Sequence, residues 1–288
     1  MNNSAIHDIC VFTVVYPSME KWIPQFTESL VNQDFQDFDL VIVNDGLDPR
    51  KLEVFNDLFN CKLLSSNKSI AKNRSTGICK MIEIGYRYVV FADADDLMAT
   101  NRISSSRELL DNYDIVVNDL ALINSNGEHI MDHYLSGRLG NFKDIQLSEI
   151  LDYNFMGLSN SSARVEILKN INIPEDIEAV DWFLFTTLLN RGYHAVFTSS
   201  TSTLYRQHHF NTVGFHKPDE NNIVFLAKQK YLHYLYLQKL SEHHQNRFEE
   251  FSKLVIKLKD PFFKKVYLET INDYMPENPF WFETIQPA

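Results

Sequence analysis

The sequence predicts an α/β protein whose residues 1–97 form a doubly wound, parallel sheet. Short apolar runs rich in β-branched residues alternate with stretches whose apolar residues recur at helical spacing. Because the runs have no alternating polar face, they are typical of strands buried on both sides between two helical layers. Polar side chains also follow the ends of three of these strands, which is where α/β sheets bind their ligands.

The pattern of apolar residues and of Gly and Pro gives the position of each predicted strand and helix. The four strands are expected at 10–16, 38–46, 61–66 and 86–96, and the helices between them at 19–33, 52–59 and 69–85. Beyond residue 102 we expect a strand at 113–124, a hairpin or loop at 126–135, a helix at 147–156, and a helix ending near Gly192 that strands follow. Helices are expected again from 221 to about 259, where Pro261 stops the pattern, and over 262–271.

The composition limits the function. The net charge is −11, and its excess lies in the first 214 residues, with 17 Lys and Arg against 28 Asp and Glu. Such an acidic body disfavours nucleic-acid binding, which needs a basic surface to neutralise phosphates. A phosphorylated ligand would therefore need a divalent cation.

The chain is expected to be cytoplasmic, because its start, MNNSAIHDIC, lacks a basic signal-peptide region and no run approaches the ~20 apolar residues of a membrane span. Cys10, Cys61 and Cys79 have no CxxC spacing, which favours reduced, buried thiols.

Three aspartates crowd the end of the fourth predicted strand, in the segment VVFADADDL. Asp93, Asp95 and Asp96 would repel one another, so a positive group is expected among them. Carboxylates suit hard cations such as Mg²⁺ and Mn²⁺. Alternatively, Asp95 or Asp96 caps a helix that starts near Leu97. The position at a strand end of an α/β sheet favours the metal site.

Two further strands bring side chains to the same edge of the sheet. Val15 and Tyr16 end the first strand, and Asp45 ends the second, just before Gly46. The Asp45 carboxylate could accept a hydrogen bond from the N–H of a nucleotide base. The segment Asn-Asp-Gly is equally ordinary as a turn, so both interpretations remain open.

Two helix starts carry candidate groups. Lys72, Asn73 and Arg74 open the predicted helix 69–85, where backbone N–H groups and positive side chains favour anions, unless this is only a solvated basic helix start. Asp181 precedes an apolar helical face, either as a first-turn acid favoured by the helix dipole or as a general base facing a cleft.

The segment YRQHHFNTVG at 205–214 offers Arg206, His208 and His209. Adjacent histidines point in different directions, so at most one of the two should face the site.

Over residues 9–214 the chain resembles the inverting family 2 glycosyltransferases of the GT-A fold. The segments that carry the resemblance are FTESLVNQDFQDFDLVIVNDGLDP, SIAKNRSTGI, YVVFADADDLMATNRI, AVDWFLFTTLLNRGY and YRQHHFNTVG, in the family's order. The third matches the family's DxD strand, the fourth its Glu-Asp-Trp element and the fifth its Tyr-Arg-x-His element. The chain has Asn44, Lys72 and Val180 where the family has Asp, Arg and Glu.

The resemblance implies a Rossmann-like GT-A domain over 1–214, with a nucleotide-sugar-binding half at 1–102, an acceptor and catalytic half at 103–214, and a helical region at 215–288. It implies that Asp95 ligates Mn²⁺ or Mg²⁺, with Asp93 and His208 beside it, and that Asp181 is the catalytic base. The residues expected to bind the nucleotide sugar are Val15, Tyr16, Asp45, Lys72, Asn73, Arg74, Asp93, Ala94 and Arg206.

The resemblance also implies a function. We expect a metal-dependent, inverting transfer of a sugar from a nucleotide-diphosphate donor, with UDP as the expected nucleotide, to a hydroxyl of a glycan or lipid-linked acceptor in surface polysaccharide or glycoconjugate synthesis. A sugar-nucleotide pyrophosphorylase is disfavoured because the chain lacks a Gly-rich N-terminal loop with Arg and Lys. A non-catalytic sugar-nucleotide-binding subunit is disfavoured because Asp93, Asp95, Asp181 and His208 are all present.

The region 215–288 lies outside the resemblance. It holds ten Lys and Arg and ten Asp and Glu, and its apolar stripes are broad. We expect packing against the body or a homodimer contact rather than peripheral attachment at the inner face of a membrane, because few basic residues cluster there.

Overall fold

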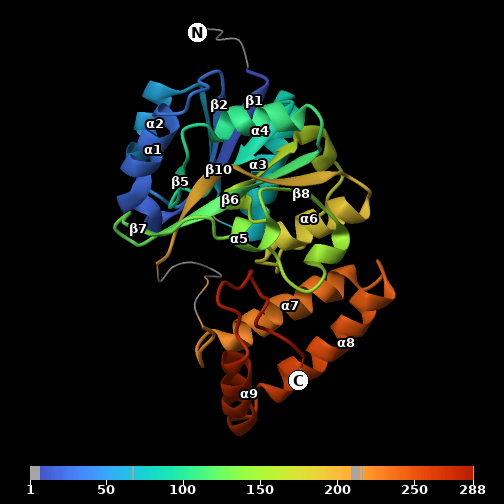
Figure 1. The fold of residues 1–288 in the computed structure, drawn as a ribbon. Coiled ribbons are helices and arrows are strands. Elements are labelled where there is room, and N and C mark those ends of the chain that lie inside the picture. The colour runs from blue at the N-terminus through green and yellow to red at the C-terminus, as the bar shows by residue number, and fades with distance from the viewer. Residues whose placement is uncertain (1–6, 67, 209–214, 216, 288) are drawn as a thin grey trace.

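The computed structural model describes residues 7–66, 68–208, 215 and 217–287 of the chain. A mixed sheet runs through the upper body in Figure 1, and three helices form a separate layer below it. The strands are β1 (Ile9–Val15), β2 (Asp39–Asp45), β3 (Cys61–Ser66), β4 (Tyr88–Phe91), β5 (Leu97–Met98), β6 (Ile115–Ile123), β7 (His129–Met131), β8 (Phe142–Ile145), β9 (Ser161–Arg164) and β10 (Ala195–Arg206). The helices are α1 (Ile23–Val31), α2 (Glu53–Leu58), α3 (Ile70–Ile84), α4 (Arg102–Leu110), α5 (Ser136–Leu139), α6 (Val180–Asn190), α7 (Ile223–Leu237), α8 (Glu242–Lys257) and α9 (Pro261–Asp273).

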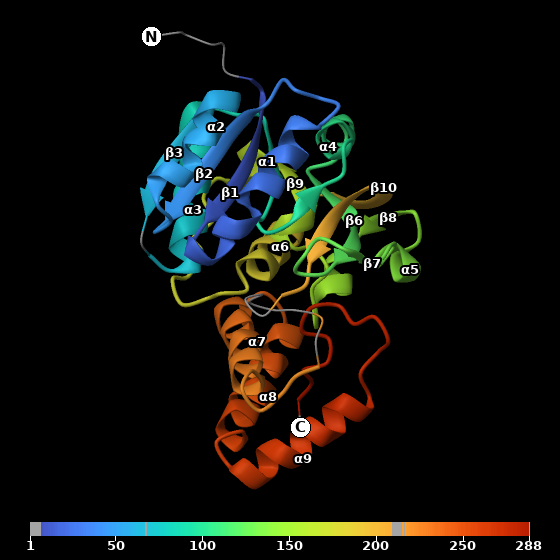
Figure 2. The same ribbon diagram turned by 90° about the vertical axis from the view of Figure 1, so that its left-hand side faces the viewer.

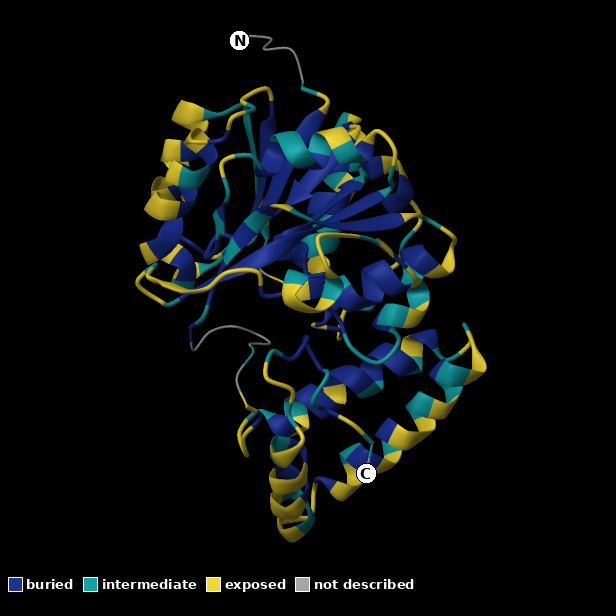
Figure 3. Cartoon of the chain, viewed as in Figure 1, coloured by how far each residue is buried: buried dark blue, intermediate teal, exposed yellow. Residues whose placement is uncertain are grey.

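The first half of the sheet is parallel, as the sequence predicts. Its strands lie in the order β3-β2-β1-β4, and every neighbouring pair among them runs parallel. All seven residues of β1 are buried. Their side chains alternate between two cores, with Val11 packed among residues of α1 and α2 and Phe12 among residues of α3. Figure 3 shows the strands as dark blue between helices with exposed outer faces, so the uniformly apolar runs reflect burial on both sides.

Helix α3 packs tightly on the sheet at Gly77. A Cβ atom built at this position would lie 2.1 Å from the Phe12 ring of β1, so only glycine allows this approach. Ser69 caps the first turn, because its hydroxyl accepts a hydrogen bond from the Lys72 backbone N–H at 3.3 Å. The start of α3 is thereby fixed at the carboxyl edge of the strands.

The second half of the sheet differs from a continued parallel pattern. Strand β9 lies between β4 and β6 and is antiparallel to both, whereas β6 and β10 are parallel. Of the two alternatives expected at 126–135, a hairpin or a loop, the hairpin forms, because β7 pairs antiparallel with β6. The expected helix at 147–156 is wrong. Only a 3-10 turn over Leu147–Ile150 forms, and the chain then runs as a buried loop in which Asn154 pairs with Trp281 of the C-terminal segment.

Some expected boundaries also change. The helix considered near Leu97 does not form there, because Leu97–Met98 pairs with β10 and the next helix starts at Arg102. Pro261 does not merely end a helix; it occupies the first turn of α9, where its missing N–H costs nothing. Cys10 is buried, but Cys79 is exposed, contrary to the expectation of buried thiols.

Helices α7, α8 and α9 lie beneath the body, and the segment after α9 rises back to it, as both Figure 1 and Figure 2 show. No helix in the described residues is long and apolar enough to cross a membrane. Helix α9 exposes Phe262, Val266 and, just beyond it, Tyr274. A dimer contact or membrane attachment through this region stays a prediction, and the expected domain boundary at residue 214 lies outside the described residues.

The returning segment is fastened by Lys230 of α7, a fully buried lysine. Its ammonium donates to three backbone carbonyls, those of Asp152 at 2.6 Å, Ile285 at 2.7 Å and Phe282 at 3.3 Å. An ammonium has three N–H donors, so this geometry uses all of them. One side chain therefore joins α7, the loop after residue 150 and the C-terminal segment.

We predict that Lys230→Met lowers the free energy of unfolding by about 2–4 kcal/mol, because three buried carbonyl oxygens lose their donor. Urea unfolding followed by circular dichroism measures this change. Lys228→Met is the matched control, since Lys228 lies on the same helix and is exposed. Equal stability of the two variants would show that the fastening contributes nothing.

Candidate functional site

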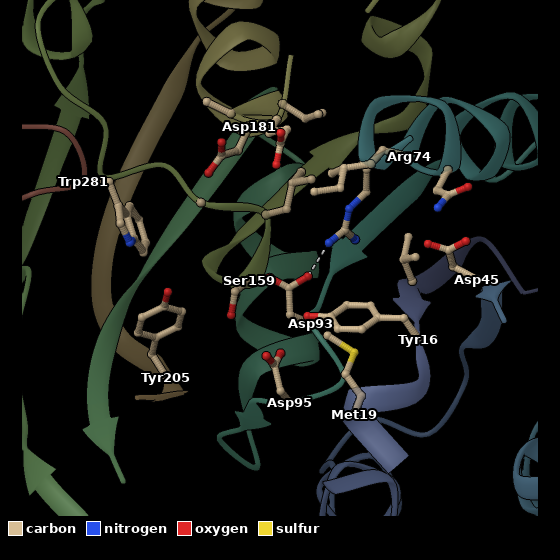
Figure 4. Close-up of a pocket in the computed structure, with 18 of the residues that line it drawn as sticks. Tyr16, Met19, Asp45, Arg74, Asp93, Asp95, Ser159, Asp181, Tyr205 and Trp281 are labelled. Atoms are coloured by element: carbon tan, nitrogen blue, oxygen red, sulfur yellow. Dashed lines mark hydrogen bonds and ion pairs between the residues drawn. The ribbon is translucent and has the colours of Figure 1, made fainter. Parts of the chain in front are cut away.

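A pocket opens at the carboxyl edge of the parallel strands, where the sequence places its polar residues (Figure 4). Tyr16 follows β1, Asp45 ends β2, and Asp93 and Asp95 follow β4. The opposite wall comes from the start of α6, which carries Asp181, and from residues near the C-terminus. The fold thus brings together groups that are more than a hundred residues apart in the chain.

The acidic turn after β4, residues Asp93–Asp96, is surrounded by positive groups of the protein. Arg74 of α3 makes an ion pair with Asp93 at 2.5 Å. Fully buried Arg102 donates at 2.6 Å to the carbonyl of Phe91, the last residue of β4. The expected positive counter-charge is therefore supplied in large part by arginines.

Asp96 is the buried member of the turn. One carboxylate oxygen accepts a hydrogen bond from the Arg206 backbone N–H at 2.7 Å, and the other accepts one from the Ser159 hydroxyl. Burial, followed by repulsion from Asp95 and Asp93, raises the pKa of the Asp96 carboxyl well above its ordinary value. Asp96 thus ties the turn to β10 and to the loop before β9, and it caps no helix.

Asp95 lines the pocket, whereas His208, its predicted neighbour, is buried and is not among the residues that line the pocket. The Nε2 atom of His208 lies 2.8 Å from an Asp95 carboxylate oxygen, and the imidazole stacks on Trp22 with ring centroids 4.3 Å apart. Within the described residues, no three His, Cys, Asp or Glu side chains converge as a preformed metal cluster. His209, the alternative histidine, lies outside the described residues.

Arg206 has a different position from the one expected. Its side chain does not line the pocket; it is fully buried beneath the acidic turn. It donates to the Asp95 carbonyl at 2.6 Å and to the side-chain oxygen of Gln25 at 2.8 Å. Burial lowers the pKa of the guanidinium, and Asp96 and Asp95 oppose this change. Arg206 therefore holds the acidic turn in place from below.

The three candidate ligand-binding residues at the start of α3 do not all face the pocket. Arg74 and Asn73 line the pocket, whereas Lys72 points outward toward Glu175, with 3.6 Å between the charged atoms. One terminal nitrogen of Arg74, Nη1, is buried and has no hydrogen-bond partner among the described residues. An unsatisfied guanidinium nitrogen at a pocket wall favours an anionic ligand.

Asp181 lies in the first turn of α6 and lines the pocket, so both features considered for it are present. One carboxylate oxygen accepts from the Trp182 backbone N–H at 2.8 Å, and the other accepts from the Asn154 side chain at 3.2 Å. The pKa of the Asp181 carboxyl is raised to about 6, mainly because burial removes water from it. The hydrogen bond from the Trp182 N–H lowers the pKa, and the negative charge of Asp93 raises it further. Such a group can accept a proton near neutral pH.

The remaining candidates are divided between pocket and core. Asp45 and Tyr16 line the pocket, and burial with the nearby charges of Asp95 and Asp93 raises the pKa of the Tyr16 hydroxyl. Val15 and Ala94 are buried in the core between the sheet and α1, so only their backbones can reach a ligand. Asn44 braces the turn, because its side chain donates to the Leu47 carbonyl at 2.8 Å and accepts from the Leu47 N–H at 2.9 Å.

Sequence reasoning missed part of the pocket wall. Ser159, Tyr205, Trp281 and Phe282 line the pocket, and the last two lie in the segment after α9. Figure 4 shows Trp281 and Tyr205 on the side opposite Asp45. The sequence signal for the last two is a run of three aromatic residues, 280–282, in a stretch without helical spacing, and such a run does not indicate where the chain packs.

The sequence matches a model of a known protein family. The model of the family described as Glycosyl transferase family 2 matches residues 10–171, which is more than half of the 288 residues. Among curated relatives, the dTDP-rhamnosyl transferase RfbG of Shigella flexneri is 26% identical over 232 residues, covering 74% of this chain and 75% of the relative.

Solved glycosyltransferase structures share the fold. TarS 1–349 from S. aureus in complex with UDP superposes with a TM-score of 0.61 at 16% identity, covering 87% of this chain and 71% of TarS 1–349. The mannosyltransferase PcManGT from Pyrobaculum calidifontis, in complex with GDP-Man and Mn²⁺, has a TM-score of 0.57 at 16% identity, covering 82% and 65%. The expected GT-A fold class is confirmed.

We predict that Arg206→Lys strongly destabilises the protein, by about 3–5 kcal/mol, because a lysine cannot replace the planar fork that joins the turn at Asp95 to Gln25 and to the loop at 124–125. Thermal unfolding with a dye or by calorimetry measures the loss. Arg87→Lys is the control, since Arg87 is an exposed arginine. A variant at position 206 as stable as this control would return Arg206 to the group of ligand-binding candidates.

Proposed function

The chain belongs to glycosyl transferase family 2 and is a glycosyltransferase, and we propose that it uses a nucleotide-diphosphate sugar as donor and a hydroxyl of a glycan or lipid-linked molecule as acceptor. The product would be part of a surface polysaccharide or glycoconjugate. The observation that carries the proposal is the convergence of Asp93, Asp95 and Asp181 on one pocket at the carboxyl edge of a parallel sheet.

The donor would lie across the end of β1. Asp45, at the far side of the pocket in Figure 4, would accept a hydrogen bond from the N–H of the base. Arg74 would use its unsatisfied nitrogen for a diphosphate oxygen while its other nitrogen remains on Asp93. We propose UDP as the nucleotide, because TarS is described in complex with UDP and RfbG is named for dTDP, which is also a pyrimidine nucleotide.

The residues at the acidic turn fit a divalent cation. Neighbouring ligands of an octahedral ion at about 2.1 Å lie about 3 Å apart, and the facing atoms of Asp95 and His208 are 2.8 Å apart. Mg²⁺ and Mn²⁺ sites commonly complete themselves with water and substrate phosphates, so two or three protein ligands suffice. Asp95 and His208 would hold the ion, with Asp93 beside it, and the ion would neutralise charge on the departing diphosphate.

Asp181 would act as the general base. Its carboxylate would remove the proton from the acceptor hydroxyl as that oxygen attacks the anomeric carbon. A single displacement from the face opposite the diphosphate inverts the configuration and needs only one base. Asn154 and the Trp182 N–H hold the two carboxylate oxygens, which fixes the orientation of the carboxylate in the pocket.

We predict that Asp95→Asn reduces the affinity for UDP in the presence of Mn²⁺ at least about tenfold, because an amide is a weaker ligand for a hard cation. Calorimetric titration with UDP, with Mn²⁺ and with a chelator, measures the effect. In the chelator the variant and the wild type should differ little. Asp48→Asn, which changes an aspartate outside the pocket, is the control. A metal-dependent affinity that survives in Asp95→Asn would contradict the metal assignment.

We predict that Asp181→Asn keeps the UDP affinity but lowers the rate of sugar transfer by about 10²–10⁴, because the side chain keeps its shape and loses its basicity. The wild-type rate should fall as the pH drops through about 6, since protonation of the raised-pKa carboxyl removes the base. Transfer is measured as UDP release against pH, with stereochemistry of the product by NMR. A variant with a near wild-type rate would point to another base.

A further inference from the structure

The segment after α9 is built into the pocket wall. Arg138 forms an ion pair with both carboxylate oxygens of Glu283, at 2.6 and 2.7 Å, and Tyr134 donates to the Pro279 carbonyl at 2.7 Å. Together with Lys230, these contacts attach residues 278–286 to two distant parts of the chain, the segment 134–138 and α7. The segment is therefore a fixed element of the site rather than a loose end.

The aromatic pair of this segment is held in a specific geometry. Phe282 has a positive φ of 66°, which is costly for an aromatic residue and occurs mainly where a function requires it. Its ring stacks on Trp182, the residue next to Asp181, with centroids 5.3 Å apart. Trp281 stacks on Phe215 at 5.0 Å. Both Trp281 and Phe282 line the pocket.

Gly157 makes room for the indole. A Cβ atom built at Gly157 would lie 2.9 Å from the Cη2 atom of Trp281, so a larger residue would displace the ring. Gly157 itself lines the pocket, as do Leu158 and Tyr205. The indole thus reaches the pocket through a position that the opposite loop leaves empty.

The two sides of the pocket differ in the kind of side chain that lines them. The side proposed to hold the donor carries the charged groups Asp45, Arg74, Asp93 and Asp95. The side next to Asp181 is lined by Gly157, Leu158, Val180, Tyr205, Trp281 and Phe282, with Glu178 as the only further charged group in the lining that the structure describes. An uncharged molecule with one apolar face and free hydroxyls suits this second side.

Asn154 connects the segment to the base. Its side chain donates to Asp181 at 3.2 Å, and its backbone N–H donates to the Trp281 carbonyl at 2.9 Å. Asn154 is fully buried, so neither contact competes with water. The position of Trp281 is therefore set relative to the carboxylate that would take the acceptor's proton.

We propose that Trp281 determines acceptor binding: the C-terminal segment forms the acceptor subsite, and the apolar C–H face of an acceptor pyranose ring packs on the indole. This inference rests on the proposed function, because it places the acceptor hydroxyl beside Asp181. Aromatic side chains bind ring faces through their large apolar area, and a sugar presents C–H groups on one face and hydroxyls at its edge. Asn154 acts as a positioning residue between the subsite and the base.

The chain has three tryptophans, Trp22, Trp182 and Trp281, so ¹⁵N-labelled protein gives three indole N–H resonances. Trp281→Phe and Trp22→Phe assign them. The protein is first saturated with UDP and Mg²⁺, and methyl glycosides of glucose, galactose, rhamnose and N-acetylglucosamine are then added separately. We expect at least one glycoside to shift the Trp281 resonance in a saturable way, while the Trp182 resonance, whose N–H is bonded to the Ile150 carbonyl at 2.7 Å, stays in place.

Two variants test the same idea through affinity. Trp281→Ala and Gly157→Ala should each weaken the affinity for that glycoside at least about tenfold, and Trp281→Phe should lose less, because a smaller ring remains. The affinity for UDP should change little in all three. Phe262→Ala is the matched control, since Phe262 is an aromatic residue of the C-terminal region that is 78% exposed.

The outcomes separate the inference from the function on which it rests. If UDP with Mg²⁺ does not bind, the proposed function itself fails. If UDP binds but no glycoside shifts the Trp281 resonance, or if UDP alone shifts it as strongly as a glycoside does, Trp281 is not the acceptor wall. Unchanged glycoside affinity in Trp281→Ala, in a variant with wild-type thermal stability, would overturn the proposal in the same way.

Discussion

The charge balance of the acidic turn Asp93–Asp96 is the constraint on which the rest of the site depends. Carboxylates crowded at the end of a buried strand repel one another and lose hydration, so the turn is stable only with positive groups around it. The chain supplies Arg74 from the side and Arg206 from below, and His208 contacts Asp95. Arg74 comes from α3, whereas Arg206 ends β10 and His208 lies two residues beyond it, so the turn forms only when β10 and α3 are in place.

Some of the charged groups around the turn stabilise it, and others are available to a ligand. Asp96 and Arg206 are buried and hold the turn in place, whereas Asp93 and Asp95 line the pocket. One buried nitrogen of Arg74, a residue of the pocket wall, has no hydrogen-bond partner among the described residues. A ligand that contains both an anion and a cation would provide an anionic partner for Arg74 and a cationic partner for the carboxylates of Asp93 and Asp95. This is the physical reason for proposing a metal-bound diphosphate as the ligand.

The C-terminal segment shows a second use of buried polar groups. Lys230 gives all three of its donors to carbonyls, and this holds an aromatic pair beside Asp181 although the pair is distant in sequence. Burial lowers the pKa of the ammonium to about 7, opposed by the charge of Asp152. Burying the Lys230 amine is thus unfavourable by itself, but its hydrogen bonds fix a wall of the pocket. The region below the sheet consequently contributes to the site and does more than cover apolar surface.

The sequence by itself determined the parallel half of the sheet, because uniformly apolar strands and Asp residues at their ends carry local signals that no tertiary contact reverses. It also placed Asp45, Asp93, Asp95 and Asp181 among the candidates, and the structure brings these four to one pocket. Only the tertiary structure decided the direction of each side chain, turning Lys72 outward and Arg206 beneath the turn. It also replaced an expected helix at 147–156 by a loop, because Asn154 and Trp281 pair across more than a hundred residues, a contact with no local signature in the sequence.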